Sequence, residues 1–457
     1  ANNTLGVLLV RRGRNLEAVP HLAVVARGGA TANFPILSNG FAQLEPVNQA
    51  KLVGAVNELA LEFPRDAQVL LTQAMLLEEL EQNEQALHKL DQLFALEAEQ
   101  PQAILLEAKL LLEAGAPKPF ARLESTLDAN PDNNALRLQY ARLLTRSDMQ
   151  AARQQFEILS AKSPRDADLL LSLALINREI GDNLAAKAYL RQLLDLEQRE
   201  SDAYYYLGRI AEAEGEPQSA VYNYMQVDGG RDFYSASGRA GQILLDQGDS
   251  ARLHAHFDKL RQEHPDRAER LYNLEADLLS RADHVNAAMG VLSRGLQDVP
   301  ESASLRYARA MLAERQDDLE LMELDLRQII ARDPDNATAL NALGYTLANR
   351  TERYDEAYQL IARALELEPE EPAILDSMGW VLYRRGQYSE AIPYLTRAYA
   401  RFPDPEVAAH LGEVLWASGD TEGAMQVWQG ALEKAPGHEV LVSTLRRLGV
   451  SGLAAGQ

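Results

Sequence analysis

The chain contains no cysteine among its 457 residues. Disulfides, zinc–thiolate sites and cysteine nucleophiles are therefore excluded. Positive charge is also scarce: the chain has 45 Lys and Arg residues against 67 Asp and Glu residues, which gives a formal net charge of −22. This balance argues against nucleic acid as a partner, since phosphate binding needs a basic surface, and against adsorption to an anionic membrane surface. No apolar run approaches the ~20 residues that a membrane span needs.

The sequence also lacks the short motifs that mark catalytic sites. It has no P-loop, no GxGxxG, no GxSxG and no HExxH. His254 and His256 are separated by one residue, so on a helix they would point to different sides, whereas chelation along a helix needs a spacing of three or four. We therefore expect no catalytic residue, no metal and no cofactor, and we interpret the chain as a protein that is not an enzyme.

Proline recurs with a regular spacing along most of the chain. Successive gaps are close to 34 residues or to a multiple of 34, and the 372 residues from the first to the last proline of the series correspond to eleven units. A fixed period of this size is the signature of a stacked repeat. The series consists of Pro64, Pro131, Pro164, Pro265, Pro300, Pro334, Pro369, Pro403 and Pro436.

A small residue follows the same period. It allows two helices to approach closely, and large apolar residues flank it at offsets of three and four, as Leu375 and Leu382 do around Gly379. A second amphipathic helix then follows in each unit and ends at the proline, which cannot continue the helical hydrogen bonds. The small residues are Gly6, Ala74, Ala108, Ala141, Ala174, Gly208, Gly241, Ala276, Ala310, Gly344, Gly379 and Gly412.

This arrangement resembles the tetratricopeptide repeat (TPR) family, whose units have about 34 residues. The match runs in phase over nearly the whole chain. The resemblance implies an all-α fold, a right-handed TPR superhelical solenoid of about twelve helix pairs. In residues 372–403 the family pattern is carried by Leu375, Met378-Gly379, Leu382, Ala391, Leu395, Ala398 and Pro403.

The repeats predict three parts of the chain. Residues 1–66 should hold partial and degenerate N-terminal repeats, because Pro35 and Pro46 interrupt the first helix of a unit there. Residues 67–438 should form the TPR array. Residues 439–457 should form a C-terminal capping helix and a disordered tail, because an amphipathic segment there would cover the apolar face of the last pair.

As a whole the chain also resembles the TPR lipoprotein adaptors of periplasmic carboxyl-terminal processing proteases in pseudomonads, including the stretch LALEFPRDAQVLLTQAMLLEEL at 59–80. The resemblance implies a non-catalytic scaffold that binds the serine protease and delivers cell-wall hydrolases to it as substrates. It also implies an outer-membrane lipoprotein in the periplasm. Membrane contact would be made only through an N-terminal lipid anchor missing from this chain, which begins inside a repeat at Leu5-Gly6. The alternative is a cytoplasmic TPR cofactor of a chaperone or secretion machine.

The resemblance also indicates where protein partners would bind. In TPR proteins the first helix of each unit lines a concave groove, and its positions 2, 5, 6, 9, 12 and 13 lie outside the packing pattern. Aromatic residues and Arg gather at these positions in three units, as they do in the hot spots of protein interfaces. For any single residue, packing on a neighbouring repeat and contact with a partner both stay open, but we expect at least one of the two clusters, around Tyr205 or around Trp380, to be a contact patch. The candidates are Tyr205, Tyr206, Arg209, Trp380, Tyr383, Arg384, His410, Glu413 and Trp416.

One frequent TPR ligand is disfavoured by the residues at position 5. Co-chaperone TPR domains grip an acidic peptide terminus with Lys, Asn and Arg, whereas successive units here have Asn341, Asp376 and Ala409 at that position. An acidic chain would also repel an acidic peptide. We therefore expect the partner to be a folded protein or an extended, neutral-to-basic segment.

Overall fold

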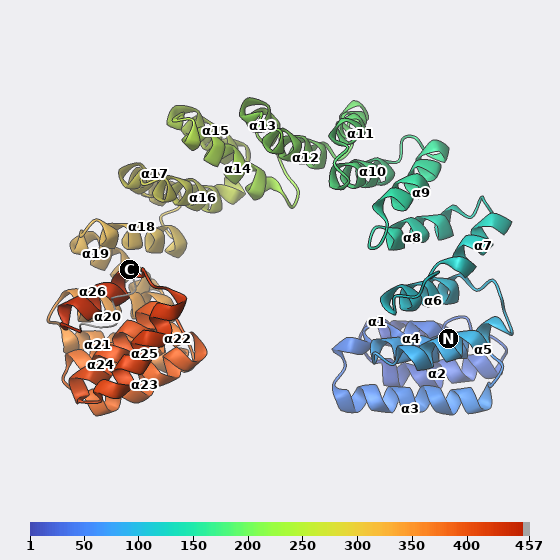
Figure 1. The fold of residues 1–457 in the computed structure, drawn as a ribbon, viewed down its shortest axis with the longest axis horizontal. Coiled ribbons are helices and arrows are strands. Elements are labelled where there is room, and N and C mark those ends of the chain that lie inside the picture. The colour runs from blue at the N-terminus through green and yellow to red at the C-terminus, as the bar shows by residue number, and fades with distance from the viewer. Residues whose placement is uncertain (451–457) are drawn as a thin grey trace. The chain divides into compact units, whose positions relative to one another are not determined.

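The computed structural model describes residues 1–450, and in these residues all regular secondary structure is helical (Figure 1). The chain divides into two compact units, Ala1–Glu214 and Gly215–Gln457. Within each unit, helices that follow one another along the chain pack as pairs, and each pair packs on the next. The all-α repeat fold expected from the sequence is confirmed. Among residues 1–450, no helix has both the length and the apolar character needed to cross a bilayer.

The first unit contains five helix pairs, a single helix α3 after the first pair, and α12 at its end. Its helices are α1 (Asn2–Arg11), α2 (Asn15–Arg27), η1 (Phe34–Ser38), η2 (Phe41–Gln43), α3 (Pro46–Glu62), α4 (Ala67–Glu79), α5 (Asn83–Phe94), α6 (Pro101–Glu113), α7 (Ala121–Ala129), α8 (Asn134–Leu144), α9 (Met149–Lys162), α10 (Ala167–Glu179), α11 (Asn183–Asp195) and α12 (Glu200–Ala213).

Two short 3-10 helices, η1 and η2, stand where a regular unit would have its first helix before α3. Pro35 lies in η1, and Gly40 adopts a left-handed backbone conformation, with φ of 71°, immediately before η2. The buried Asn15 side chain donates hydrogen bonds of 2.9 Å to the carbonyls of Leu37 and Asn39. These side-chain hydrogen bonds replace the backbone ladder that a helix would supply.

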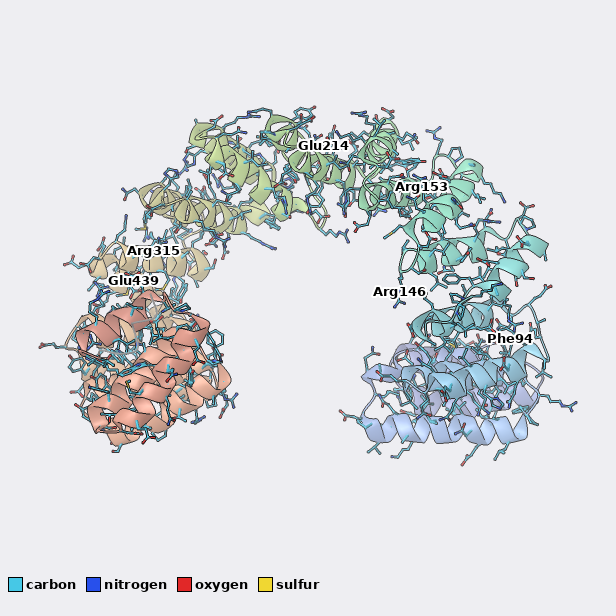
Figure 2. The ribbon with its side chains drawn as sticks, viewed as in Figure 1. Phe94, Arg146, Arg153, Glu214, Arg315 and Glu439 are labelled. Atoms are coloured by element: carbon cyan, nitrogen blue, oxygen red, sulfur yellow. The ribbon has the colours of Figure 1, made fainter. Side chains whose placement is uncertain are left out.

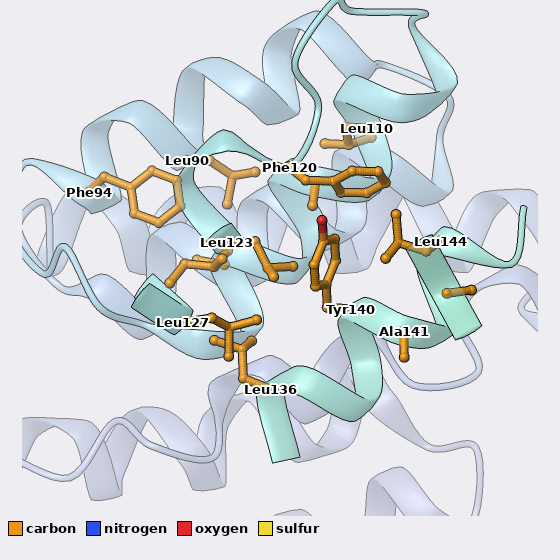
Figure 3. Packing of buried hydrophobic residues seen from close by; sticks show 14 of the residues in the cluster. Leu90, Phe94, Leu110, Phe120, Leu123, Leu127, Leu136, Tyr140, Ala141 and Leu144 are labelled. Atoms are coloured by element: carbon orange, nitrogen blue, oxygen red, sulfur yellow. The ribbon is translucent and has the colours of Figure 1, made fainter. Parts of the chain in front are cut away.

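The core of the first unit interlocks side chains from successive helices (Figure 3). Phe120 lies at the end of the Pro-containing segment between α6 and α7, and its ring packs edge-to-face on Tyr140 of α8 with centroids 5.3 Å apart. The Tyr140 hydroxyl donates a 2.6 Å hydrogen bond to Glu124. Phe120 therefore joins the irregular connection to the same core as the helices.

The second unit contains six helix pairs, preceded by α13 and followed by α26. Its helices are α13 (Pro217–Tyr224), α14 (Phe233–Asp246), α15 (Ser250–Glu263), η3 (Pro265–Arg267), α16 (Ala268–Arg281), α17 (Val285–Asp298), α18 (Ala303–Arg315), α19 (Leu319–Arg332), α20 (Ala337–Arg350), α21 (Tyr354–Leu367), α22 (Pro372–Arg384), α23 (Tyr388–Arg401), α24 (Pro405–Ser418), α25 (Thr421–Lys434) and α26 (Glu439–Arg447).

The periodic small residue is the point of closest approach within a pair. A Cβ added to Gly379 of α22 would lie 2.4 Å from a side-chain carbon of Leu395 on α23. A Cβ on Gly412 of α24 would lie 2.2 Å from the indole nitrogen of Trp428 on α25. Contacts this short are not found in folded proteins, so these two positions require glycine. The sequence period therefore has a direct steric cause.

Ion pairs about one repeat apart in sequence connect the helices. In several pairs a basic residue of the second helix reaches back to an acidic residue just before the first helix of the same pair. These closing ion pairs are Lys162–Asp132, Arg332–Glu301, Arg363–Asp335 and Arg397–Glu370. Others join successive pairs, and Figure 2 labels Arg146, Arg153 and Glu214, whose partners are Glu113, Asp182 and Lys187. Exposed pairs of this kind contribute little individually, about 0–1 kcal/mol.

The described chain ends with helix α26, which packs against α24. Leu441 and Leu445 are buried in a cluster with Trp428, so this helix covers the apolar face of the last pair. The disordered tail expected at the end of the chain falls on residues 451–457, which lie outside the described residues.

Candidate functional site

The second unit contains a cavity of about 690 Å³, which we call the acidic groove. Its wall is formed by the first helices of four successive pairs, α18, α20, α22 and α24, and by the loops before α22 and α24. The wall residues are Tyr307, Met311, Glu314, Thr338, Asn341, Ala342, Tyr345, Thr346, Glu368, Glu371, Pro372, Ala373, Ile374, Asp376, Ser377, Phe402, Asp404, Glu406 and Val407.

Helical spacing explains how each helix presents its residues to the acidic groove. Tyr307, Met311 and Glu314 follow one another at offsets of four and three on α18, and such offsets place side chains on one face. Six wall residues are Asp or Glu, and none is Lys, Arg or His. The wall therefore combines aromatic and apolar surface with negative charge.

The hydroxyl groups of the wall hold its carboxylates in place. Tyr345 donates a 2.9 Å hydrogen bond to Glu406, and Thr346 donates one of 3.1 Å to Glu314. Burial and then the Glu406 carboxylate raise the pKa of Tyr345, and burial and then Glu314 raise the pKa of Tyr307. Both tyrosines therefore remain neutral and can donate hydrogen bonds.

One carboxylate of the wall, Asp376, contacts a buried histidine. His410 of α24 is buried, and its Nδ1 lies 2.9 Å from a carboxylate oxygen of Asp376 on α22. The imidazole also stacks on the Trp380 indole, with ring centroids 4.2 Å apart. Burial alone would lower the pKa of His410, but the Asp376 carboxylate outweighs it and the pKa is raised. His410 thus contacts the Asp376 carboxylate from inside the protein.

A second cavity of about 500 Å³, the C-terminal pocket, is lined by Asn349, Trp380, Tyr383, Arg384, Tyr388, Glu413 and Arg447. Glu413 accepts hydrogen bonds from Tyr383 (3.0 Å) and, through both carboxylate oxygens, from Arg447 of α26. Arg384 donates 2.7 Å to the Tyr354 hydroxyl. Unlike the acidic groove, this pocket contains positive side chains, and its one carboxylate is already paired with Arg447.

In the first unit, Tyr205, Tyr206 and Arg209 lie together on α12. The two tyrosine rings pack edge-to-face at 5.2 Å, and the guanidinium of Arg178 lies 5.1 Å from the Tyr206 ring. Arg209 donates a long, 3.4 Å hydrogen bond to the Tyr205 hydroxyl. The three residues therefore form a cluster, but both of its rings are buried.

Most of the candidate rings are buried, as packing on neighbouring repeats predicts for single residues. Residues of the neighbouring repeat cover the rings, because the first helices of successive pairs pack closely enough for their groove positions to touch. Trp380, for example, is only 6% exposed under His410. Tyr383, Arg384, Arg209 and Trp416 keep part of their surface. The buried candidates are Tyr205, Tyr206, Trp380, His410 and Glu413. Whether any of the nine candidates contacts a partner stays a prediction.

The sequence interpretation missed the residues that carry the charge of the acidic groove. Glu314, Tyr345 and Glu406 occupy groove positions of their units, as Tyr307 does. The same rule of groove positions, applied to every unit and to acidic as well as aromatic residues, would have found them. Asn341 and Asp376 had been assigned to position 5, and both do line the acidic groove.

The histidines weighed as metal ligands have other roles. His254 contacts Glu275, a fully buried carboxylate that also accepts a 2.6 Å hydrogen bond from Arg261. His256 is buried, and burial lowers its pKa to about 4. Within residues 1–450, no group of three or more His, Asp or Glu residues is arranged to hold a metal ion.

Comparison with known proteins agrees with this architecture. Two family models, each described as a tetratricopeptide repeat, match residues 171–230 and 377–439, and residues 335–404. A relative, TPR repeat-containing protein PA4667 of Pseudomonas aeruginosa, is 39% identical over 414 residues, or 90% of this chain and 70% of that protein. The chain belongs to the tetratricopeptide repeat family. TPR proteins bind protein partners, and the chain is placed among proteins that mediate protein–protein interaction.

Other similarities are more distant. Type IV pilus assembly protein PilF of Pseudomonas aeruginosa is 25% identical over 164 residues, which are 33% of this chain and 65% of that protein. A crystal structure of a tetratricopeptide repeat protein from Parabacteroides merdae covers 54% of this chain and 98% of its own, with 15% identity and a TM-score of 0.40.

Proposed function

We propose that the chain is a non-catalytic adaptor that binds a periplasmic carboxyl-terminal processing protease and delivers cell-wall hydrolases to it. The observation that carries the proposal is the acidic groove, which four successive repeats build and which has the charge and aromatic surface suited to a protein segment. The likeness of the sequence to TPR lipoprotein adaptors supplies the identity of the two partners. In its full-length form the protein would be an outer-membrane lipoprotein in the periplasm.

Such an adaptor acts without any chemistry of its own. A protein that holds protease and substrate together raises the local concentration of substrate, and linked binding of this kind can gain about 10²–10⁴ in overall affinity. The acidic groove uses only four of the repeats, so the other repeats remain for a second partner. Two partners could therefore occupy different repeats.

The test is a reconstitution with three purified components: this chain, the processing protease and one cell-wall hydrolase. We expect rapid loss of the hydrolase only when all three are present, and co-elution of the chain with the protease in size-exclusion chromatography. The matched control replaces the chain with an unrelated TPR protein of similar length. Hydrolase cleavage that is equally fast without the chain, or by the chain with no protease, would refute the proposal.

The alternative function, a cytoplasmic cofactor of a chaperone or secretion machine, finds some support in the similarity to a pilus assembly protein. Fractionation of cells that produce the full-length protein separates the two functions. Recovery with the outer membrane favours the adaptor, whereas recovery in the cytosol favours the alternative.

A further inference from the structure

Apart from His410 beside Asp376, the acidic groove offers negative charge without a basic side chain paired to it. Among the described residues, no Lys or Arg forms an ion pair with Glu314, Glu406 or Asp404. On the neighbouring helices α19 and α21, by contrast, Glu323 and Glu356 have such partners. The hydroxyl groups of Tyr345 and Thr346 already donate to carboxylates, and Ser377 donates to a backbone carbonyl. An ionised carboxylate only accepts hydrogen bonds, so the occupant of the groove has to donate them.

Glu314 shows that this charge is not explained by the stability of the helices. It is the penultimate residue of α18, near the helix C-terminus, where the macrodipole makes a carboxylate unfavourable. Glu371, Asp404 and Glu406, in contrast, lie at helix N-termini, where acidic residues are favoured for local reasons. Because its position costs helix stability and its side chain lines the groove, Glu314 indicates a role in binding rather than in folding.

Two further features of the wall fit a positively charged occupant. The rings of Tyr307 and Tyr345 lie in the same wall as the carboxylates, and aromatic faces attract ammonium and guanidinium groups. The side-chain oxygen of Asn341 is buried and accepts no hydrogen bond. Buried acceptors without a donor are rare in folded proteins, and an N–H donor from a ligand would satisfy this one.

We infer that the acidic groove binds an extended segment of a protein partner through a Lys or Arg side chain held between Glu314 and Glu406. Its volume lies within the ~300–1,000 Å³ of pockets that enclose small ligands, which suits a few residues of a chain rather than a folded face. This inference rests on the proposed function, because it names the chemistry by which the adaptor recognises the protein that it delivers.

The first experiment selects ligands without assuming a sequence. A display library of random eight-residue peptides is panned against the full chain and, in parallel, against the Glu314→Gln/Glu406→Gln double variant. We expect the full chain to enrich peptides with Lys or Arg at one fixed position and the double variant to lose that enrichment. Peptides enriched without Lys or Arg, equal enrichment on both proteins, or no enrichment at all would overturn the inference.

The second experiment measures affinity by fluorescence polarisation with the most enriched peptide. Each charge-assisted hydrogen bond is stronger than a neutral one, so loss of both carboxylates should weaken binding at least about ten-fold. Glu320→Gln/Glu352→Gln is the matched control, since it removes two exposed acidic charges outside the groove, and it should stay within about two-fold of the unaltered chain. A double variant that binds as tightly as this control would contradict the inference.

Gln at position 406 keeps an acceptor for the Tyr345 hydroxyl, and circular dichroism of both double variants establishes that they are folded. The reconstitution with protease and hydrolase separates the inference from the proposed function. If the Glu314→Gln/Glu406→Gln variant loses the peptide but still delivers the hydrolase, the acidic groove is not the delivery site and the adaptor function stands. If the chain binds the peptide but never accelerates cleavage, the adaptor function fails and the cation site stands.

Discussion

The contact between Gly412 and Trp428 gives a sharp test of how the last repeat is packed. In Gly412→Ala the new methyl group would lie 2.2 Å from the indole nitrogen of Trp428 and 2.4 Å from the neighbouring ring carbon. Trp428 is fully buried among Ala408, Ala424 and Leu441, so the ring has little room to move away. Overpacking typically costs about 1–3 kcal/mol.

We assign this clash the upper value, about 3 kcal/mol, because a rigid ring rather than a flexible side chain is hit. The better helix propensity of Ala offsets about 1 kcal/mol, so Gly412→Ala should lower the free energy of unfolding by about 2 kcal/mol. The matched control is Gly430→Ala in the partner helix α25. Its added Cβ would meet no atom within 4 Å, so this variant should gain about 1 kcal/mol instead.

The assay is urea unfolding followed by tryptophan fluorescence. All three tryptophans of the chain lie between residues 380 and 428, so the signal reports the end of the second unit. The midpoint should move to lower urea for Gly412→Ala and to higher urea for Gly430→Ala. Equal or higher stability of Gly412→Ala would refute the packing described for α24 and α25.

Three further predictions concern buried groups. His256 has a folded-state pKa of about 4 against an ordinary value of 6.5, so the unfolded state binds the proton first, and stability falls by as much as about 3 kcal/mol as the pH drops from 6.5 to 4. Urea unfolding followed by circular dichroism should show a smaller loss of stability at acid pH for His256→Phe than for the unaltered chain. Equal losses would contradict this. Trp380→Ala should destabilise the chain by about 3–5 kcal/mol, and Trp416→Ala, at a partly buried ring, should destabilise it by less. The fluorescence assay with the remaining tryptophans measures both, and the reverse order would make Trp416 the packing residue. Asp325→Asn should lower the free energy of unfolding by about 3–5 kcal/mol, because it leaves the largely buried guanidinium of Arg309 without its carboxylate. A melting temperature unchanged in differential scanning calorimetry would exclude that role.

The repeat could be read from the sequence because its causes are local. The close approach at Gly379 and Gly412 demands a small residue at a fixed place in the unit, and proline ends a helix wherever it occurs. Spacing alone therefore predicted the helices and their pairing. The irregular segment before α3 was also visible, since Pro35 lies where a regular helix would have needed a backbone donor.

The burial of the candidate site residues could not be predicted in this way. A position in the repeat fixes the side of a helix on which a residue lies, but not the distance to the first helix of the next pair. His410 covers Trp380 because α22 and α24 lie close enough for their rings to stack at 4.2 Å. The acidic groove likewise depends on residues from different repeats, Glu314 and Glu406, which no motif within one unit brings together.

The closing ion pairs bear on how a protein of this kind can change in length. In Arg332–Glu301 and in Arg363–Asp335 both charges belong to the same repeat, one just before its first helix and one in its second. Deletion or duplication of a whole unit therefore removes or adds both partners of a closing ion pair together. Deletion of half a unit separates them and also exposes an apolar helix face. Gain and loss of segments in whole repeats is thus the tolerated route to longer and shorter chains.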